Sequence, residues 1–366
     1  MARCVSFFAM RSSAIQTQLA PSRKPARIHA AALNLAAYTV AALIIGILAR
    51  GIRPAQLSRD LLHARLGLFI PVAMASLVFW LLGDTMVYAR LFSYFHVRTR
   101  FREMLPGAAA HEFLQVVNGV AAGTSLAWFI QMRKGVDWLD AGCTLGLLGF
   151  IDLQVIALML LITGRVAPGA LLGIVWYYPA LFIAASCAFA AFWLRGRPES
   201  RLAQWVYQRP SLSAFRDARP THYLKLSLIR IPTFALQGLV LYFEMIAFGM
   251  RAPLAAVMAI LPVVLAAGAL PFAPSGLGTR QAAIVVGFRA FGPRASLLAM
   301  SLAHSWIVIV GRLLLGLMIG GSVIKSVMRG PATELSLVPP RMRDGTSRFS
   351  VDERSRPSTR ACATDI

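Results

Sequence analysis

The sequence has few acidic residues: 15 aspartates and glutamates stand against 37 lysines and arginines, for a formal net charge of +22. Charged residues of either sign make up only 14% of the chain, whereas 57% is hydrophobic and the mean hydropathy is +0.64. This composition lies outside the range of soluble globular domains and indicates an integral membrane protein. The basic residues lie mostly between and beside apolar runs, and no aromatic-interleaved basic module is present. We therefore expect contacts with anionic lipids and no nucleic-acid partner.

Cysteine is also scarce, with four residues that lie far apart at Cys4, Cys143, Cys187 and Cys362. Their spacing fits neither a disulfide framework nor a metal site. The sequence also shows no nucleophile with an adjacent base and no paired catalytic carboxylates at helical spacing. We therefore predict no metal, no cofactor and no enzymatic activity.

Long apolar runs dominate what remains, and a membrane-spanning helix needs ~20 such residues. Eight runs have about that length, which predicts an all-α polytopic membrane bundle of about seven or eight transmembrane helices with one or two re-entrant or broken segments. The runs are Ala30–Ala49, Leu66–Ala89, Ala109–Ile130, Ala141–Thr163, Gly169–Leu194, Leu224–Gly249, Pro253–Phe272 and Ala295–Gly320.

The order of basic, apolar and polar segments predicts the organisation of the chain. Residues 1–29 form a basic tail, residues 30–325 the transmembrane domain, and residues 326–366 a polar tail that we expect to be disordered. The transmembrane domain divides into halves 30–194 and 224–325, joined by the basic loop 195–223. This loop is rich in arginine, which favours the cytoplasmic face.

Counting crossings predicts one re-entrant segment. If all eight runs spanned the membrane from a cytoplasmic N-terminus, the basic loop would fall on the wrong side. The run Ala109–Ile130 is the best candidate to enter and leave on one face, because its first half, HEFLQVVNG, is polar. The stretch LPFAPSGLGTR at residues 270–280 is broken in a similar way. The matching order of features suggests duplicated halves, although the similarity is too weak to establish a repeat.

Several ionisable residues fall inside the apolar runs, where each needs a partner, a cavity or the headgroup layer. For Asp84 we favour an interfacial pair with Arg90, and for Arg230 a long side chain that reaches the headgroups. Asp152 lies near the centre of its run and must face the protein interior. His304 is expected to be a packed polar residue rather than a proton relay.

The segment Met245–Thr333 contains no acid. Any internal counter-charge for Arg280 or Arg312 is therefore expected from the first half or from a bound anion such as a lipid phosphate. The protein candidates are Asp152, Glu112 and Glu244.

A polar stripe precedes these residues in the first half. Glu112, Gln115 and Asn118 recur at intervals of three, which places them on one side of a helix. Such a stripe lines a cavity or forms a polar seam between helices, and the spacing does not choose between the two.

The segment PFAPSGLGTRQAAIVVGFRAFGPRASLLAMSLAHSWIVIVGRLLLGLMIGG, at residues 271–321, resembles the signature region of the lysylphosphatidylglycerol synthase transmembrane-region family. Members of this family share a P-x-G-G-L-G-x-x-E pattern followed by a helix and a spanning run. The earlier blocks VVNGVAAGTSLAWFIQMRKGVDW and GFIDLQVIALML are also similar, so the resemblance covers roughly residues 30–325. The sequence departs from the pattern at Gln281, where the family usually has glutamate.

The resemblance implies a flippase-like transporter of a lipid or lipid-linked substrate with an anionic headgroup, in the bacterial cytoplasmic membrane. The alternative is an accessory protein that presents a lipid to a partner enzyme of lipid biosynthesis. In the leading hypothesis the broken segment and the polar face of the first half contact the substrate. The candidate binding residues are Arg280, Arg312, Ser275, Gly276, Gly278, Gln281, Asn118, Glu112 and Asp152.

Overall fold

The computed structural model describes residues 23–117, 119–163, 177–194, 212–269 and 276–329, and all regular structure in these ranges is helical. The predicted all-α class is confirmed for this part of the chain. Asn118, Ser275, most of the basic loop and nearly all of both tails lie outside the described residues. The helices are α2 (Arg23–Ala49), α3 (Pro54–His63), α4 (Leu66–Phe95), α5 (Phe101–Val117), α6 (Gly119–Lys134), α7 (Trp138–Thr163), α9 (Tyr177–Leu194), α11 (Ser213–Asp217), α12 (Pro220–Ala247), α13 (Leu254–Gly268), α14 (Thr279–Gly287) and α15 (Arg294–Arg329).

The long apolar helices make this a multi-pass membrane protein. Within the described ranges, four helices are long and apolar enough to cross a membrane: α4, α7, α12 and the Arg294–Ser326 part of α15. A fifth span is added if the end of α2 and α3, which meet at a bend of 87°, are counted as one broken span. The count of seven or eight spans stays a prediction, because the other apolar helices in the described ranges are shorter.

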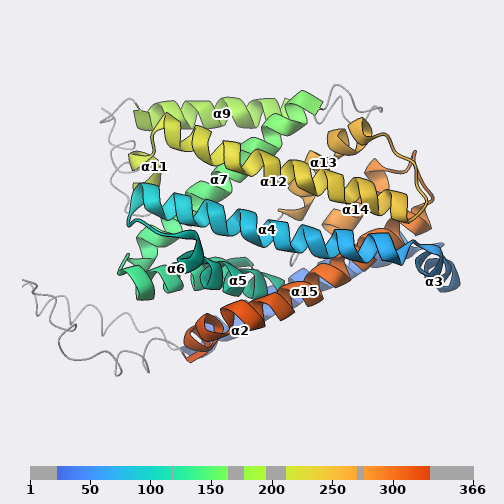
Figure 1. The fold of residues 1–366 in the computed structure, drawn as a ribbon, viewed down its shortest axis with the longest axis horizontal. Helices are drawn as coiled ribbons and strands as arrows, with labels where there is room; N and C mark the ends of the chain where they lie inside the picture. The colour runs from blue at the N-terminus through green and yellow to red at the C-terminus, as the bar shows by residue number, and fades with distance from the viewer. Residues whose placement is uncertain (1–22, 118, 164–176, 195–211, 270–275, 330–366) are drawn as a thin grey trace, which may run out of the picture. The chain divides into compact units, whose positions relative to one another are not determined.

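Helices α4 and α12 lie side by side and antiparallel, and they connect the two halves of the chain (Figure 1). At one end, the Arg65 N–H donates to the Ala247 carbonyl at 2.8 Å. At the other end, the Tyr94 and His222 rings stack with their centroids 5.1 Å apart. These contacts fix the register of the pair along its whole length.

The predicted re-entrant segment of the first half is an antiparallel hairpin of α5 and α6. Lys134 at the end of α6 lies 2.6 Å from Glu103 at the start of α5, so the hairpin returns to the end from which it began. Gly107 allows this close packing, because a Cβ there would lie 2.4 Å from the Phe129 ring. We call this element the first hairpin; that the run Ala109–Ile130 within it enters and leaves the membrane on one face stays a prediction.

A second hairpin, formed by α13 and α14, lies at the opposite end of the bundle from the first (Figure 1). The connection between its helices contains Gly276 and Gly278, with φ of +71° and +85°, a region that glycine adopts readily. A Cβ on Gly276 would lie 2.8 Å from the Gly268 Cα, and one on Gly278 would lie 3.0 Å from the Ala41 carbonyl oxygen of α2. Conformation and close packing therefore both require glycine at these positions.

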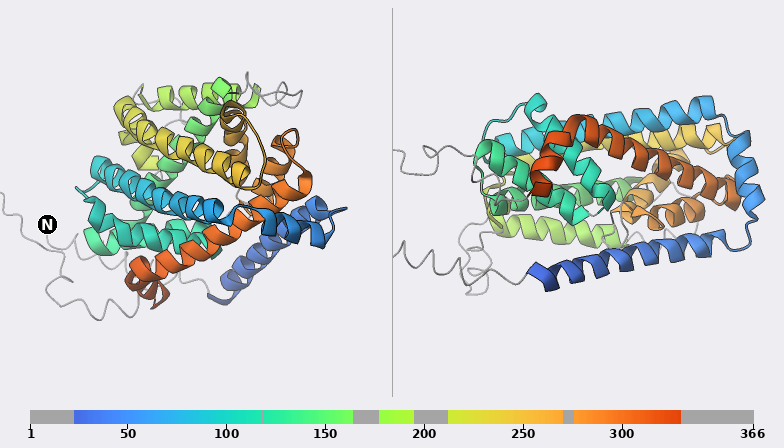
Figure 2. Two further views of the ribbon diagram at one scale, coloured as in Figure 1. Left: turned by 45° about the vertical axis from the view of Figure 1, so that its right-hand side comes forward. Right: turned by 90° about the horizontal axis from the view of Figure 1, so that it is seen from below.

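Each hairpin packs against a long helix of the other half. Helix α7 contacts α13, where Thr163 Oγ1 lies 3.4 Å from the Ala259 carbonyl oxygen. Helix α15 crosses α5, since a Cβ on Gly320 would lie 2.6 Å from the Ala110 nitrogen. The order long helix, hairpin, long helix occurs twice, first as α4, the first hairpin and α7, and then as α12, the second hairpin and α15. The two sets run in opposite directions (Figure 2), which is consistent with the suggested duplication.

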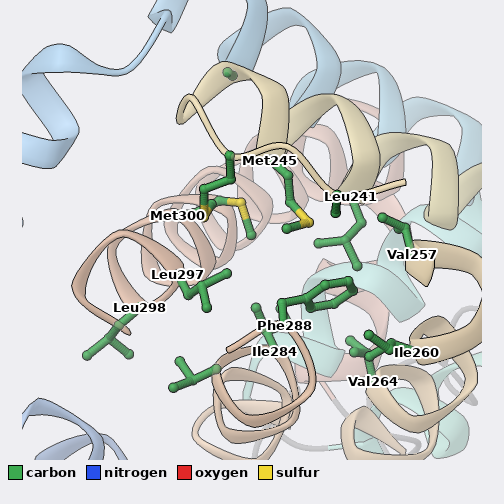
Figure 3. Packing of buried hydrophobic residues seen from close by; sticks show 14 of the residues in the cluster. Leu241, Met245, Val257, Ile260, Val264, Ile284, Phe288, Leu297, Leu298 and Met300 are labelled. Carbon is green, nitrogen blue, oxygen red and sulfur yellow. The ribbon is translucent and has the colours of Figure 1, made fainter. Parts of the chain in front are cut away.

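A compact apolar cluster holds the second hairpin between α12 and α15. Phe288, which is fully buried, lies at its centre beside Ile284 and Ile260 (Figure 3). Met245 of α12 and Met300 of α15 close the cluster from the other side. In a bilayer such contacts stabilise by packing, because lipid tails are as apolar as the core.

We predict that Phe288→Ala lowers the free energy of unfolding in detergent by roughly 3 kcal/mol, the lower end for such truncations, because mainly packing is lost. Thermal unfolding of the purified protein measures the effect. Val286→Ala is the matched control on the same helix, because Val286 is 48% exposed. Equal melting temperatures for the two variants would contradict the assignment of Phe288 to the core.

Candidate functional site

Ionisable side chains inside the bundle gather where α4, α5, α7, α12 and α15 face one another. An ionised group at the centre of a membrane costs at least ~2.5 kcal/mol unless it is compensated. Most of these groups form pairs between helices that are far apart in sequence. The pairs therefore balance charge and fix helix positions together.

Arg230 of α12 is the centre of the largest group. Its Nη1 donates to Asp84 of α4, and its Nη2 donates to Asp152 of α7 at 3.0 Å. Its Nε also lies 2.6 Å from Asp152 Oδ1, but the Nε–H is not aligned for a hydrogen bond. One arginine thus ties three helices together, and two carboxylates share its single positive charge.

Two predictions for this group were wrong. Asp84 pairs with Arg230 instead of Arg90, and Arg230 is 3% exposed instead of reaching the headgroups. Six residues along a helix turn the side chain by about 240°, so Arg90 is exposed while Asp84 faces α12. Asp152 faces the interior as expected.

Glu112 of the first hairpin supplies the counter-charge for Arg312 of α15, with 2.9 Å between Oε2 and Nε. This confirms that a counter-charge for the acid-free segment comes from the first half. Gly316 and Gly320 follow on the same face of α15 and let it approach α5 closely. The contact between Glu112 and Arg312 lacks the alignment of a hydrogen bond, and the Glu112 carboxylate also lies beside Asp84 of the Arg230 group.

A third pair joins α12 to α15. His304 Nδ1 lies 2.5 Å from Glu244 Oε1, and both residues are buried. The expectation that His304 is a packed polar residue is confirmed by its 4% exposure. When His304 carries its proton on Nδ1, the Nδ1–H donates to an ionised Glu244. The other ring nitrogen, Nε2, is then available to a different partner.

A cavity of about 70 Å³ lies beside the second and third pairs. A water molecule needs about 10–15 Å³ of such space, so the cavity holds a few waters or one small anionic group. No acid is among the described residues that line it. They are Ser76, Leu77, Trp80, Gln237, Leu265, Arg280, His304, Val308 and Arg312.

Arg280, at the start of α14, brings a positive charge to this cavity without forming an ion pair to any residue in the described ranges. Glu244 attracts it and Arg312 repels it, and Glu244 is already bound to His304. The cavity thus combines one unpaired guanidinium with a second that is held only by Glu112. This arrangement suits an anion.

Comparison with known proteins agrees with this picture of a membrane domain. Residues 34–316 match the family described as the lysylphosphatidylglycerol synthase TM region. The chain belongs to that family. No curated protein matches the chain.

All residues that line the cavity fall within the part that matches the lysylphosphatidylglycerol synthase TM region family. Of the predicted binding residues, Arg280 and Arg312 line the cavity. Glu112 does not line it but forms an ion pair with Arg312. Asp152 instead belongs to the Arg230 group. Asn118 and Ser275 lie outside the described residues, so the structure does not place them.

Gln281, where the family pattern has glutamate, closes the glycine turn before Arg280. Its Oε1 accepts from the Gly278 N–H at 2.6 Å, and its Nε2 donates to Ser305 Oγ at 2.8 Å. The first bond is the reach-back half of a capping box, a role that glutamate and glutamine share. The side chain therefore ties α14 to α15 and holds the turn that places Arg280.

Sequence reasoning assigned only Arg280 and Arg312 to the binding site and missed the other seven residues that line the cavity: Ser76, Leu77, Trp80, Gln237, Leu265, His304 and Val308. A helical signal for some of them is present, because Ser76 and Trp80 are four residues apart, as are His304, Val308 and Arg312 in turn. Neither stripe is distinctive among apolar neighbours. Their significance becomes visible only when α4 and α15 face each other.

We predict that Gln281→Leu destabilises the protein by roughly 1–3 kcal/mol, because the buried Gly278 N–H loses its acceptor. Gln281→Glu keeps most of the stability, since a carboxylate accepts from both the N–H and a rotated Ser305 hydroxyl. Thermal unfolding compares the variants, with the exposed Gln56→Leu as control. A Gln281→Leu protein as stable as the wild type would contradict the capping role.

Proposed function

We propose that this protein is a flippase-like transporter that moves a lipid with an anionic headgroup across the bacterial cytoplasmic membrane. We propose transport, without an enzymatic reaction on the lipid. The observation that carries the proposal is Arg280, which lines an acid-free cavity inside a membrane bundle without an ion pair among the described residues.

The electrostatics of the cavity support an anionic ligand. A guanidinium inside a membrane bundle without an ion pair is costly, and a bound phosphate reduces that cost while forming charge-assisted hydrogen bonds. Arginine suits phosphate because its planar donors bind two oxygens at once. Membrane lipids supply phosphate at this depth only when the headgroup leaves the bilayer surface.

Arg312 offers a way to couple binding to movement. It lines the cavity with Arg280 of the second hairpin and pairs with Glu112 of the first. A phosphate that engages Arg312 competes with Glu112, whose contact with Arg312 lacks the alignment of a hydrogen bond. Headgroup binding would then loosen α15 from the first hairpin, as alternating access between inverted halves requires.

The size of the cavity limits what enters it. A volume of about 70 Å³ suits one phosphate group and excludes acyl chains. We therefore propose that the headgroup alone occupies the cavity while the chains stay among the bilayer lipids.

We predict that Arg280→Gln slows the movement of fluorescent phosphatidylglycerol in proteoliposomes at least tenfold, because a charged hydrogen bond to phosphate contributes about 1.5–3 kcal/mol. Arg312→Gln has an effect of similar size. Chemical quenching of the outer-leaflet fluorophore measures the rate. Arg289→Gln is the matched control, because Arg289 is exposed and does not line the cavity.

Folded, inserted Arg280→Gln and Arg312→Gln proteins that move the lipid at the wild-type rate would contradict the proposed site. If the wild type retains phosphatidylglycerol but moves none, the accessory function is correct instead. Lipid presentation to a partner enzyme then becomes the role to examine.

A further inference from the structure

A second cavity, of about 350 Å³, opens at the mouth of the first hairpin, where α5 begins and α6 ends. It shares no lining residue with the cavity at Arg280. The residues around it are Thr99, Arg102, Glu103, Met104, Pro106, Phe129, Ile130, Arg133 and Lys134.

Three cations and one acid line this mouth cavity. Lys134 is bound to Glu103 at 2.6 Å, and this hydrogen bond holds the pKa of the Glu103 carboxyl below its usual value. Glu103 is therefore ionised at neutral pH and balances Lys134. Arg102 and Arg133 are exposed, and neither forms an ion pair with another described residue. The mouth cavity therefore has a net charge of two positive guanidinium groups, those of Arg102 and Arg133.

The floor of the mouth cavity is apolar. Met104, Phe129 and Ile130 are each at most 5% exposed, and Pro106 adds a further apolar surface. An apolar floor beneath two arginines matches an amphipathic molecule whose anionic group lies above hydrocarbon. Basic pockets between helices at the headgroup level are where anionic lipids bind.

The position of the mouth cavity fits that level. His96 at the end of α4 contacts Thr144 near the start of α7, and Ser213 of α11 contacts Asp140. These helix ends and the hairpin mouth form one end of the bundle (Figure 1), which the sequence predicts to be cytoplasmic.

We propose that one anionic phospholipid binds the mouth cavity, with its phosphate between Arg102 and Arg133 and its glycerol and upper acyl carbons on the apolar floor. Each guanidinium donates to the phosphate oxygens, and the planar fork favours two bonds from each arginine. This site is separate from the transport cavity and does not depend on the proposed function.

Native mass spectrometry of the full chain, titrated with phosphatidylglycerol, tests the site. We expect Arg102→Ala with Arg133→Ala to weaken the tightest lipid binding at least tenfold. The control Arg90→Ala with Arg98→Ala removes two exposed arginines near the same end of α4 that do not line the cavity. It should change the affinity less than twofold.

A double Lys variant, Arg102→Lys with Arg133→Lys, separates charge from geometry and guards against misfolding. It should bind with intermediate affinity, because lysine keeps the charge but loses the two-oxygen fork. The same tenfold loss should appear when Arg102→Ala and Arg133→Ala are added to the Arg280→Gln protein, so failure of the transport proposal leaves this result unaffected.

Two outcomes would overturn the proposal. Equal weakening by the control pair would show that only the general positive charge attracts lipid. Displacement of the lipid by an equal concentration of inorganic phosphate would show that the site holds free phosphate and that the apolar floor contributes nothing.

Discussion

Charge inside an apolar bundle must be balanced, and the Arg230 group is where this constraint organises the protein. Arg230 binds Asp84 and Asp152 from two other helices while it is almost fully buried. Removing one partner from such a group leaves an uncompensated buried charge. The pairing therefore requires α4, α7 and α12 to keep one relative position, and the two hairpins are built around this fixed unit.

Against that fixed unit, the remaining charges are loosely held. Arg312 contacts Glu112 without an aligned hydrogen bond, and Arg280 has no ion pair among the described residues. Both arginines line one cavity, although they come from α15 and from the second hairpin. The cavity thus lies at arginines other than Arg230, although Glu112, the partner of Arg312, also lies beside Asp84 of the Arg230 group.

The sequence predicted features that depend on composition along the chain, such as the all-helical class and the long apolar helices. The acid-free stretch likewise forced the counter-charge of Arg312 to come from elsewhere, and Glu112 supplies it. Pairing between helices was harder, because it depends on how each helix is rotated about its axis. The sequence predicts Arg90, six residues away on the same helix, as the partner of Asp84. In the structure α4 packs closely on α12, where Gly83 lies against Thr233, and Arg230 of α12 is the partner instead.

We propose above that Arg280 and Arg312 hold a phosphate inside the bundle. Cryo-electron microscopy of the protein in nanodiscs that contain phosphatidylglycerol tests it directly, because the cavity is small and its lining is known. We expect density for a phosphate about 2.7–3.2 Å from the Arg280 guanidinium. An empty cavity with Arg280 bound to Glu244 would contradict it.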